Sequence, residues 1–565
     1  METFSPRLIS KKLISTCVYI GLAFFFFACA DSSKPPEKDV VGKPEQLAER
    51  TRENLKKLLI FTSTNNRKMN DSVALHSFVL VNTVYQNNNY QTIWSQNITW
   101  NPIADSLYHV VQHAMEYGLF PADYNSRPLK AIWTKFQSDP VSRMDAALLA
   151  RADVLFTEAY FTIARHLKMG RLQPDSLTFR RDSVYDDNYF LQYFNKAVSR
   201  NGIVQSFRDL EPRYTDYLKI RYGIKSFLDS ARFVNYTYIQ YPYKDSVIYI
   251  KTLLKRLTEE NHIPKETQPG DSVVLAEGIK NYQLSRGLKP TGKLTESLVR
   301  RLNLTDWEKF KTIAVTLDRY KLLPDTLPET YALVNLPSYT LYVYDYDTLA
   351  LRSKVIVGSP KTQTPVLNSK ISNFITYPQW TVPYSIIFKE MLPKIQKNVD
   401  FLRRQNLMVV DGDDNVIDPE TIDWSELDKN NFPYLIRQKE GDDNSLGVIK
   451  FNFPNKYSVY LHDTNARSFF RRSSRALSHG CVRVQEWEKL SHFLIRGDTI
   501  QYPPDTLKAW ISRQEKHTIT GFPKLPLFIR YFTVEGKNGK LTFYEDIYGD
   551  DRLLKEKYFS GKSIS

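Results

Sequence analysis

Two short segments near the carboxyl-terminal end contain side chains that suit nucleophilic catalysis. They are residues 458–463, Ser-Val-Tyr-Leu-His-Asp, and residues 478–484, Ser-His-Gly-Cys-Val-Arg-Val. If each segment is a strand, alternation places Tyr460 and His462 on one face of the first, and Cys481 and Arg483 on one face of the second. The intervening Val and Leu side chains then point the opposite way, into a core. The pattern predicts a thiol, an imidazole, a phenol and a guanidinium on one surface.

Each of these groups has a function in acyl transfer. A thiolate at Cys481 is a nucleophile, and a nearby imidazole at His462 can take its proton. Backbone N–H groups at Gly480 and Cys481 suit an oxyanion hole, with Tyr460 as a further donor. Arg483 can hold a substrate carboxylate. Taken singly, His462 is better explained as a structural histidine and Cys481 as a buried filler, but their matching patterns together favour a cysteine acyl-transfer enzyme.

Cysteine usage and the amino terminus together predict export. Arg7, Lys11 and Lys12 precede an apolar run at residues 13–28, which is short for a membrane span and typical of a secretory signal peptide. The run ends at Cys29, and a cysteine at this place resembles the lipidation site of a bacterial lipoprotein. The alternative is an uncleaved signal anchor. Beyond this leader the chain has one cysteine, Cys481, so an internal disulfide is excluded.

Composition narrows the function classes further. The 565 residues are long enough for about three domains, and the formal net charge is +15. Such a charge favours solubility or attraction to an anionic polymer. Export argues against nucleic acid, and no nucleic-acid-binding signature is present, whereas peptidoglycan stem peptides, which carry carboxylates, fit the location better. The sequence contains no phosphate-binding loop, dinucleotide fingerprint, paired-cysteine metal site or His-Glu-x-x-His helix.

The periodicity of apolar residues predicts an α+β multidomain chain. A tether is expected over residues 30–53, after the signal peptide at 1–29, because it is polar and contains prolines. Residues 54–244 show helical periodicity and predict a helical scaffold in which no catalytic cluster is evident. Residues 245–305 predict a small three-helix unit, with turns at Gly287 and Gly292 and with Thr295 capping its last helix.

The periodicity then changes to two. Residues 328–560 predict a mostly β domain that begins with a hairpin of residues 331–335 and 340–345. Further strands are expected at 351–357, 371–377, 380–383, 447–453 and 457–462. A more helical and charged stretch, about 389–446, predicts a helical lid inserted into this domain. A hairpin across residues 535–540 is expected near the end of the chain.

The motif Ser478-His479-Gly480-Cys481 with the upstream His462 resembles the signature of the L,D-transpeptidase (YkuD-type) catalytic domain. Residues 339–344, 357–358, 364–365, 380–383 and 446–451 resemble the long YcbB-like Gram-negative branch of that family. Residues 117–124 resemble the helical scaffold of this branch, and residues 245–305 resemble its small peptidoglycan-binding domain. His479 stands where some long-branch relatives carry Ser, which weakens any catalytic role for His479.

The resemblance implies a reaction, a place and a set of residue roles. Cys481 attacks the diaminopimelate carbonyl of a donor stem tetrapeptide, D-Ala leaves, and the amine of an acceptor diaminopimelate captures the thioester. His462 is the general base and acid, oriented by the backbone carbonyl of Asp463, with the oxyanion hole around Gly480. Substrate-binding residues are expected to be Arg483, His479, Ser478 and Trp380. The resemblance implies that no metal or cofactor is needed and that carbapenems acylate the site. Lipidation at Cys29 implies a periplasmic location at the outer membrane.

Two other classes of function remain open from the sequence. An L,D-carboxypeptidase or an amidase can use the same thioester and let water resolve it. A non-catalytic peptidoglycan-binding lipoprotein, with Cys481 inert, is the alternative outside enzymes. Binding alone gives no reason for the paired Tyr460/His462 and Cys481/Arg483 faces, so the sequence favours the transpeptidase.

Overall fold

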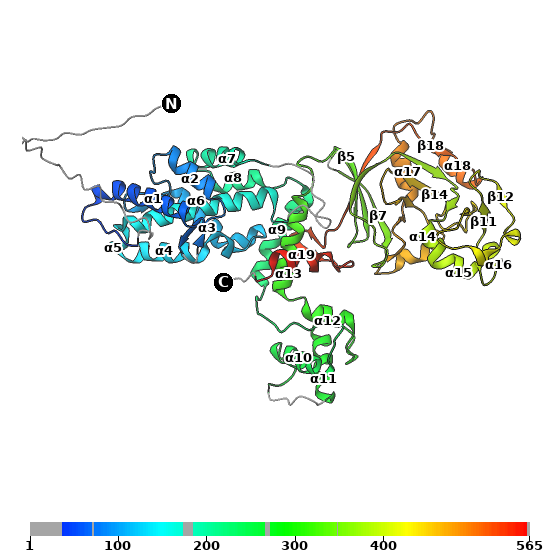
Figure 1. The fold of residues 1–565 in the computed structure, drawn as a ribbon, viewed down its shortest axis with the longest axis horizontal. Coiled ribbons are helices and arrows are strands. Elements are labelled where there is room, and N and C mark those ends of the chain that lie inside the picture. Colours follow the sequence, from blue (N-terminus) through cyan, green and yellow to red (C-terminus); the bar gives the residue numbers. More distant parts are fainter. Residues whose placement is uncertain (1–36, 71–72, 173–184, 266–271, 347, 562–565) are drawn as a thin grey trace, which may run out of the picture.

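The protein is an elongated arrangement of three units in the computed structural model, which describes residues 37–70, 73–172, 185–265, 272–346 and 348–561 (Figure 1). A helical unit occupies one end, a β-rich unit the other, and a small helical unit hangs from the middle. The predicted signal peptide, Cys29 and the start of the tether lie outside the described residues. Within the described part of the chain, no helix combines the length and apolarity needed to cross a membrane.

The first unit is built around helix α6, Ala146–Met169. Nineteen of its 24 residues are buried, which is the composition of a helix surrounded by others. Asp145 caps its start by accepting the N–H groups of Ala147 and Leu148. The elements around it are η1 Pro44–Gln46, α1 Leu47–Thr64, β1 Lys68–Asn70, β2 Val73–Ala74, α2 Phe78–Asn87, β3 Ser95–Gln96, β4 Thr99–Trp100, α3 Pro102–Gln112, η2 Ala114–Tyr117, η3 Pro121–Tyr124, α4 Ser126–Ser138, α5 Pro140–Arg143, α7 Asp187–Ser199, α8 Ile203–Leu210 and α9 Thr215–Ser230.

The prediction of a tether as far as residue 53 is wrong. Helix α1 begins at Leu47, and Leu47, Leu55 and Leu58 are all buried in the first unit. Pro44 occupies the first position of η1, where a proline costs no hydrogen bond, so it starts this helical stretch instead of marking a linker.

The small unit contains α10 Ser246–Glu259, α11 Ser272–Ser285 and α12 Glu296–Asn303. The Thr295 side chain accepts the Leu298 N–H and caps α12. The next helix, α13 Asp306–Tyr320, was not expected from the sequence. It is buried on several sides: Ile313, Leu317 and Tyr320 share a core with residues of α9 and of the β-rich unit. Helix α13 therefore joins all three units.

The β-rich unit contains one mixed sheet of eleven strands among the described residues. Its order is β18-β9-β14-β15-β17-β7-β6-β5-β19-β8, with β16 beside β7. The strands are β5 Thr330–Asn335, β6 Thr340–Asp345, β7 Thr348–Gly358, β8 Leu367–Ile371, β9 Asn373–Thr376, β14 Ile449–Asn452, β15 Leu461–His462, β16 Ala476–Ser478, β17 Val482–Val484, β18 Thr518–Ile519 and β19 Leu525–Arg530, with η7 Arg467–Arg471, α17 Trp487–Ile495 and α18 Thr506–Ser512 outside it. The predicted first hairpin is present as β5 and β6.

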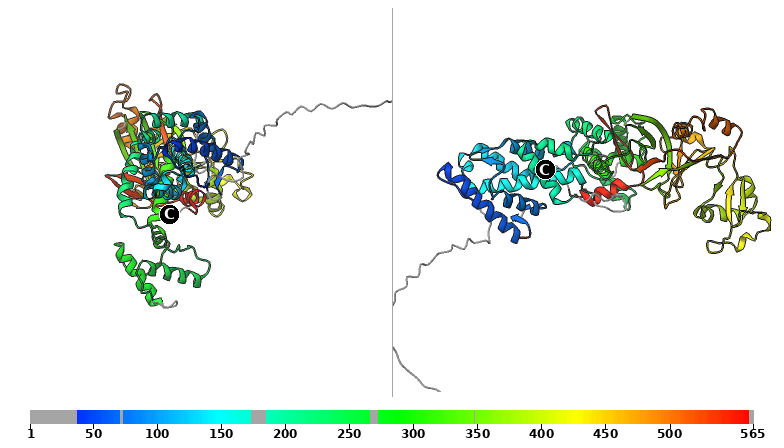
Figure 2. Two further views of the ribbon diagram at one scale, coloured as in Figure 1. Left: turned by 90° about the vertical axis from the view of Figure 1, so that its left-hand side faces the viewer. Right: turned by 90° about the horizontal axis from the view of Figure 1, so that it is seen from above.

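The inserted segment is not purely helical, contrary to the prediction. It contains a four-stranded sheet, β10-β13-β11-β12, as well as helices, around a core of its own. It lies at the end of the molecule away from the scaffold (Figure 2). Its elements are β10 Trp380–Thr381, α14 Tyr384–Ile386, the π-helix η4 Ile387–Met391, α15 Leu392–Ile395, α16 Asp400–Arg404, β11 Leu407–Val410, β12 Val416–Ile417, η5 Pro419–Thr421, η6 Trp424–Glu426 and β13 Leu435–Gln438.

The end of the chain returns to the scaffold. Strand β19 pairs with β5 inside the large sheet, and a hairpin of β20 Val534–Lys537 and β21 Lys540–Phe543 follows, then α19 Asp550–Phe559 beside α13. The predicted turn across residues 535–540 is too long. Asn538 and Gly539 both have positive φ, which allows a two-residue hairpin turn.

Gly536 allows this hairpin to lie directly on helix α9. A Cβ at this position would stand 2.3 Å from the Lys219 carbonyl of α9. We expect Gly536→Ala to destabilise the protein by about 1–3 kcal/mol, because the backbone of α9 cannot move away without unpacking the hairpin. The measurement is the melting temperature. Gly497→Ala, which adds a methyl group in open space, is the matched control, and equal melting temperatures for the two variants would contradict the packing argument.

Candidate active site

The parallel pairing of β15 with β17 brings the two predicted segments together. Leu461 lies opposite Val482, and His462 lies opposite Arg483. The Val482 N–H donates to the Tyr460 carbonyl over 3.1 Å. This bond extends the pairing by one residue and brings Tyr460 next to Cys481. Residues opposite each other on neighbouring strands share a face of the sheet. Leu461, Val482 and Val484 point into the main core of the β-rich unit, as the alternation predicts.

The first segment is less regular than expected. Only Leu461 and His462 form a strand, whereas a strand was predicted from residue 457. Ser458 has a φ of 55°, a left-handed conformation that interrupts the strand. Because of this turn the Ser458 carbonyl, rather than its side chain, approaches the site, and it lies 3.9 Å from the Cys481 Sγ.

Ser478 braces the turn that carries the thiol. Its hydroxyl donates to the Cys481 carbonyl over 2.6 Å and accepts the Gly480 N–H over 3.2 Å. The side chain is buried, so the structure gives it a structural role in place of the predicted substrate contact. The predicted oxyanion donor Gly480 is occupied by this bond. The Cys481 N–H has no hydrogen-bond acceptor among the described residues, so it is the available backbone donor.

Gly480 is held from its other side by Thr364. The Gly480 carbonyl accepts the Thr364 hydroxyl over 2.7 Å, and the Gly480 φ of 119° is one that side chains other than hydrogen rarely allow. The same Thr364 hydroxyl accepts the Gly358 N–H over 2.8 Å. Thr364 therefore ties the nucleophile turn to strand β7. Sequence analysis singled out residues 364–365 only as part of a resemblance and assigned them no role.

The environment keeps the Cys481 thiol protonated. Burial raises its pKa, while the N–H and hydroxyl of Tyr460 and the charges of Lys450 and Arg483 act in the opposite direction. Burial likewise raises the pKa of Tyr460, whose phenol lies near the thiol and the Trp380 indole. At neutral pH the nucleophile is therefore a thiol that needs a base at the moment of attack.

His462 is a buried neutral imidazole. Burial, then the charge of Arg483, lowers its pKa to about 3, and backbone groups of Asp463 and Leu446 oppose this only in part. Its Nδ1 is buried and makes no hydrogen bond with the described residues. The ring stands edge-on to Tyr460, with 5.6 Å between the ring centroids. A histidine in this state is unprotonated throughout the neutral range, as a general base must be before the reaction, although burial weakens its basicity.

The Asp463 carboxylate supports the backbone beside His462. It accepts the Val448 N–H over 3.1 Å and forms an ion pair of 2.7 Å with Arg467. Gly447 passes so close that a Cβ there would lie 2.3 Å from the Asp463 Oδ2. The predicted orienting contact concerned the Asp463 carbonyl. That backbone does lie close enough to raise the His462 pKa, and the Leu446 backbone, which sequence analysis did not identify, acts with it.

Arg483, His479 and Trp380 surround the thiol in different ways. Arg483 donates to the Thr464 hydroxyl over 3.2 Å, and its buried Nε has no partner in the described part of the chain. His479 points away and forms an exposed hydrogen bond with Glu390, 2.7 Å from Nε2 to Oε1, which links the nucleophile turn to the π-helix of the insertion. Trp380 belongs to the insertion's sheet and reaches the Tyr460 phenol.

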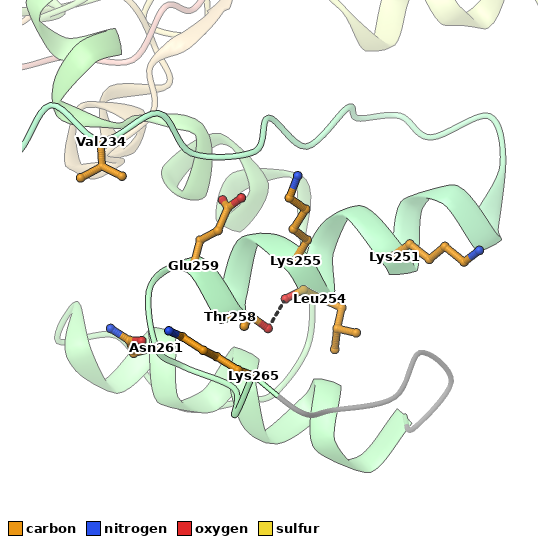
Figure 3. A pocket seen from close by; sticks show the side chains of 8 residues that line it. All are labelled: Val234, Lys251, Leu254, Lys255, Thr258, Glu259, Asn261 and Lys265. Atoms are coloured by element: carbon orange, nitrogen blue, oxygen red, sulfur yellow. Dashed lines mark hydrogen bonds between the residues drawn. The ribbon is translucent and has the colours of Figure 1, made fainter.

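A hollow in the small helical unit lacks comparable chemistry. It has a volume of about 620 Å³ and lies against helix α10, and its lining includes Lys251, Lys255 and Lys265 but no cysteine or histidine (Figure 3). No cluster of three or more His, Cys, Asp or Glu side chains suited to a metal ion occurs in the residues that the structure describes. The chemistry is thus concentrated around Cys481.

Comparison with known proteins agrees with this geometry. Residues 329–501 match the model of the L,D-transpeptidase catalytic domain (YkuD), and residues 79–222 match a scaffold domain. A Haemophilus influenzae protein with the provisional name L,D-transpeptidase is 36% identical over 251 residues, which are 43% of this chain and 48% of that protein. The match thus spans about half the length of the curated relative. Within residues 329–501 the chain is therefore similar to the L,D-transpeptidase catalytic domain.

Two solved structures are also similar. One is the avibactam carbamoyl enzyme of Ldtfm, with 13% identity, a TM-score of 0.17, and coverage of 45% of this chain and 80% of that one. The other is a cysteine-to-serine mutant of an Enterococcus faecium L,D-transpeptidase, with 12% identity, a TM-score of 0.17, and coverage of 46% and 83%.

The protonation state of Cys481 is directly measurable. In a chain that begins at Glu37, Cys481 is the only cysteine, so iodoacetamide reports on it alone. Because burial raises the thiol pKa above the ordinary 9.0, we expect the alkylation rate to keep rising about tenfold per pH unit through pH 9. Glutathione measured in parallel provides the control. A rate that levels off below pH 8 would show instead a thiolate at rest.

Proposed function

We propose that the protein is a peptidoglycan L,D-transpeptidase that joins the diaminopimelate residues of two stem peptides through a thioester on Cys481. The observation that carries the proposal is the position of Cys481 beside Tyr460, one register step from the buried, neutral His462. This arrangement lies inside the segment that matches the L,D-transpeptidase catalytic domain. Carbapenems are the expected acylating inhibitors of such a site.

The proposed first half-reaction follows from the protonation states. The Cys481 sulfur bonds to the carbonyl carbon of the donor diaminopimelate while His462 takes the thiol proton. The Cys481 N–H donates to the oxygen that becomes negative, and Tyr460 is a second donor on the same side. The intermediate collapses when His462 returns its proton to the leaving nitrogen, which releases D-Ala and leaves a thioester. These reaction steps require a neutral His462 and a protonated thiol at the start.

The second half-reaction returns the thiol. The side-chain amine of an acceptor diaminopimelate attacks the thioester, loses its proton to His462, and displaces the sulfur, which then recovers the proton. Water in place of the amine gives the L,D-carboxypeptidase or amidase that the sequence left open. We assign to the insertion the role of covering the donor, and the exposed hydrogen bond between His479 and Glu390 of the insertion supports this role.

The product mixture distinguishes these reactions. A disaccharide-tetrapeptide containing diaminopimelate is incubated with the chain from Glu37 onward, and the products are analysed by mass spectrometry. We expect a dimer joined between two diaminopimelate residues, and no product above background with Cys481→Ala, a loss of at least about a thousandfold. Gly497→Ala, altered in open space, is the matched control. Tripeptide without dimer would indicate a hydrolase instead of a transpeptidase. Unchanged substrate with every variant would refute the proposal that the protein is an enzyme.

We also propose that the mature protein is attached to the periplasmic side of the cell envelope, in the outer membrane, by a lipid on Cys29. The support is the sequence alone: a positive amino terminus, an apolar run and a cysteine at its end.

The anchor predicts a fractionation result. In a Gram-negative host grown with labelled palmitate, we expect the label on the full-length chain and the protein in the outer-membrane fraction. Cys29→Ala removes the label, because the lipid is attached through that sulfur. Cys17→Ala, which changes the other leader cysteine, is the matched control. Label retained by Cys29→Ala would contradict the lipoprotein.

A further inference from the structure

Lys450 is a half-buried cation on the catalytic face that sequence analysis did not identify. It lies on β14 opposite His462 of β15, which in turn lies opposite Arg483 of β17. Because residues in register share a face, the three side chains form a row across the sheet. Its neighbours on β14, Ile449 and Phe451, are fully buried in the core on the opposite face.

We propose that Lys450 is a positioning residue whose ammonium group stabilises negative charge on the Cys481 sulfur. The inference rests on the proposed function only in taking Cys481 as the nucleophile.

The position of the ammonium group supports this role. Its Nζ lies 4.2 Å from the centroid of the Tyr460 ring, a cation–π distance. The Tyr460 carbonyl also accepts the N–H of Val482, the residue that follows Cys481. The Tyr460 ring therefore fixes the lysine on the side of the sheet from which the thiol projects.

Lys450 lacks the carboxylate that usually accompanies a desolvated lysine. Its ammonium group makes no hydrogen bond or ion pair with the residues that the structure describes. The titratable groups that face it are His462 on β15 and Arg483 on β17, with Tyr460 and Cys481 just before those strands, and none of them is a carboxylate. Its neighbour in register on β9 is Ile375. Holding an unpaired cation away from water is costly, and the thiol is the group near it that can become an anion.

Lys450 and Cys481 each affect the pKa of the other. Burial lowers the pKa of Lys450, and negative charge on Cys481 opposes that effect. Reciprocally, the charge of Lys450 lowers the pKa of the Cys481 thiol against the effect of burial. The same charge, together with that of Arg483, disfavours a proton on His462. The two cations thus favour a negatively charged sulfur and a histidine that passes its proton on.

Lys450→Met tests this role, because methionine keeps much of the unbranched stem and removes the charge. In the chain from Glu37 onward, we expect iodoacetamide to alkylate Cys481 of this variant about tenfold more slowly at pH 8, with the whole pH profile moved to higher pH. Lys450→Arg is expected to keep the wild-type profile. Lys456→Met is the matched control, since Lys456 is exposed and lies over Tyr457 instead.

The outcomes distinguish an effect of the Lys450 charge from a loss of folded structure and from a failure of the proposed function. Equal profiles for wild type and Lys450→Met would overturn the proposal, as would a shift that Lys450→Arg fails to restore. If Lys450→Met does not fold, as judged by its melting temperature, Lys450→Gln replaces it under the same criteria. Alkylation requires no peptidoglycan, so a protein that makes no dimer can still show the shift, and the two proposals fail independently.

Discussion

The site depends on one contact, the parallel pairing of two very short strands. The Val482 N–H to Tyr460 carbonyl bond and the His462–Arg483 register bring a thiol and an imidazole from different segments to one face. Strands of two and three residues form few hydrogen bonds of their own, so their position depends on the residues that surround them. Below, Leu461 and Val482 are fully buried. At the turn, Ser478 and Thr364 occupy the polar groups of Gly480. These backbone hydrogen bonds hold the turn that carries the nucleophile.

Burial then determines the protonation states on this face. It raises the pKa of the thiol and lowers that of the imidazole, so both groups are neutral at rest. A neutral pair avoids the cost of two desolvated charges and leaves the charge to appear during the reaction. Lys450 and Arg483 are fixed cations near the place where it appears. Arg483 is oriented by Thr464 and Lys450 by the ring of Tyr460.

The sequence predicted those features that local pattern determines. The β5–β6 hairpin follows from period-two alternation, and Val482 with Val484 identified the buried face of the nucleophile strand because only apolar residues lie there. Features set by distant partners were missed. Ser478 looked like a substrate contact until its acceptor and donor were both found within three residues. Lys450 lies in an ordinary strand, and its role appears only through its register with His462. The Asn538-Gly539 turn was present in the sequence and was overlooked.

The carboxyl-terminal hairpin shows why the scaffold and the catalytic sheet form one body. The Glu535 carboxylate accepts the Asn335 amide of β5 and the hydroxyls of Tyr342 and Tyr544. Gly536 of the same strand lies against the backbone of α9. From the scaffold side, Asp216 of α9 accepts the Tyr344 hydroxyl of β6 over 2.8 Å. A rotation of the sheet against the scaffold breaks these contacts together. Movement during catalysis is therefore expected in the insertion, which contacts the nucleophile turn through the exposed hydrogen bond between Glu390 and His479.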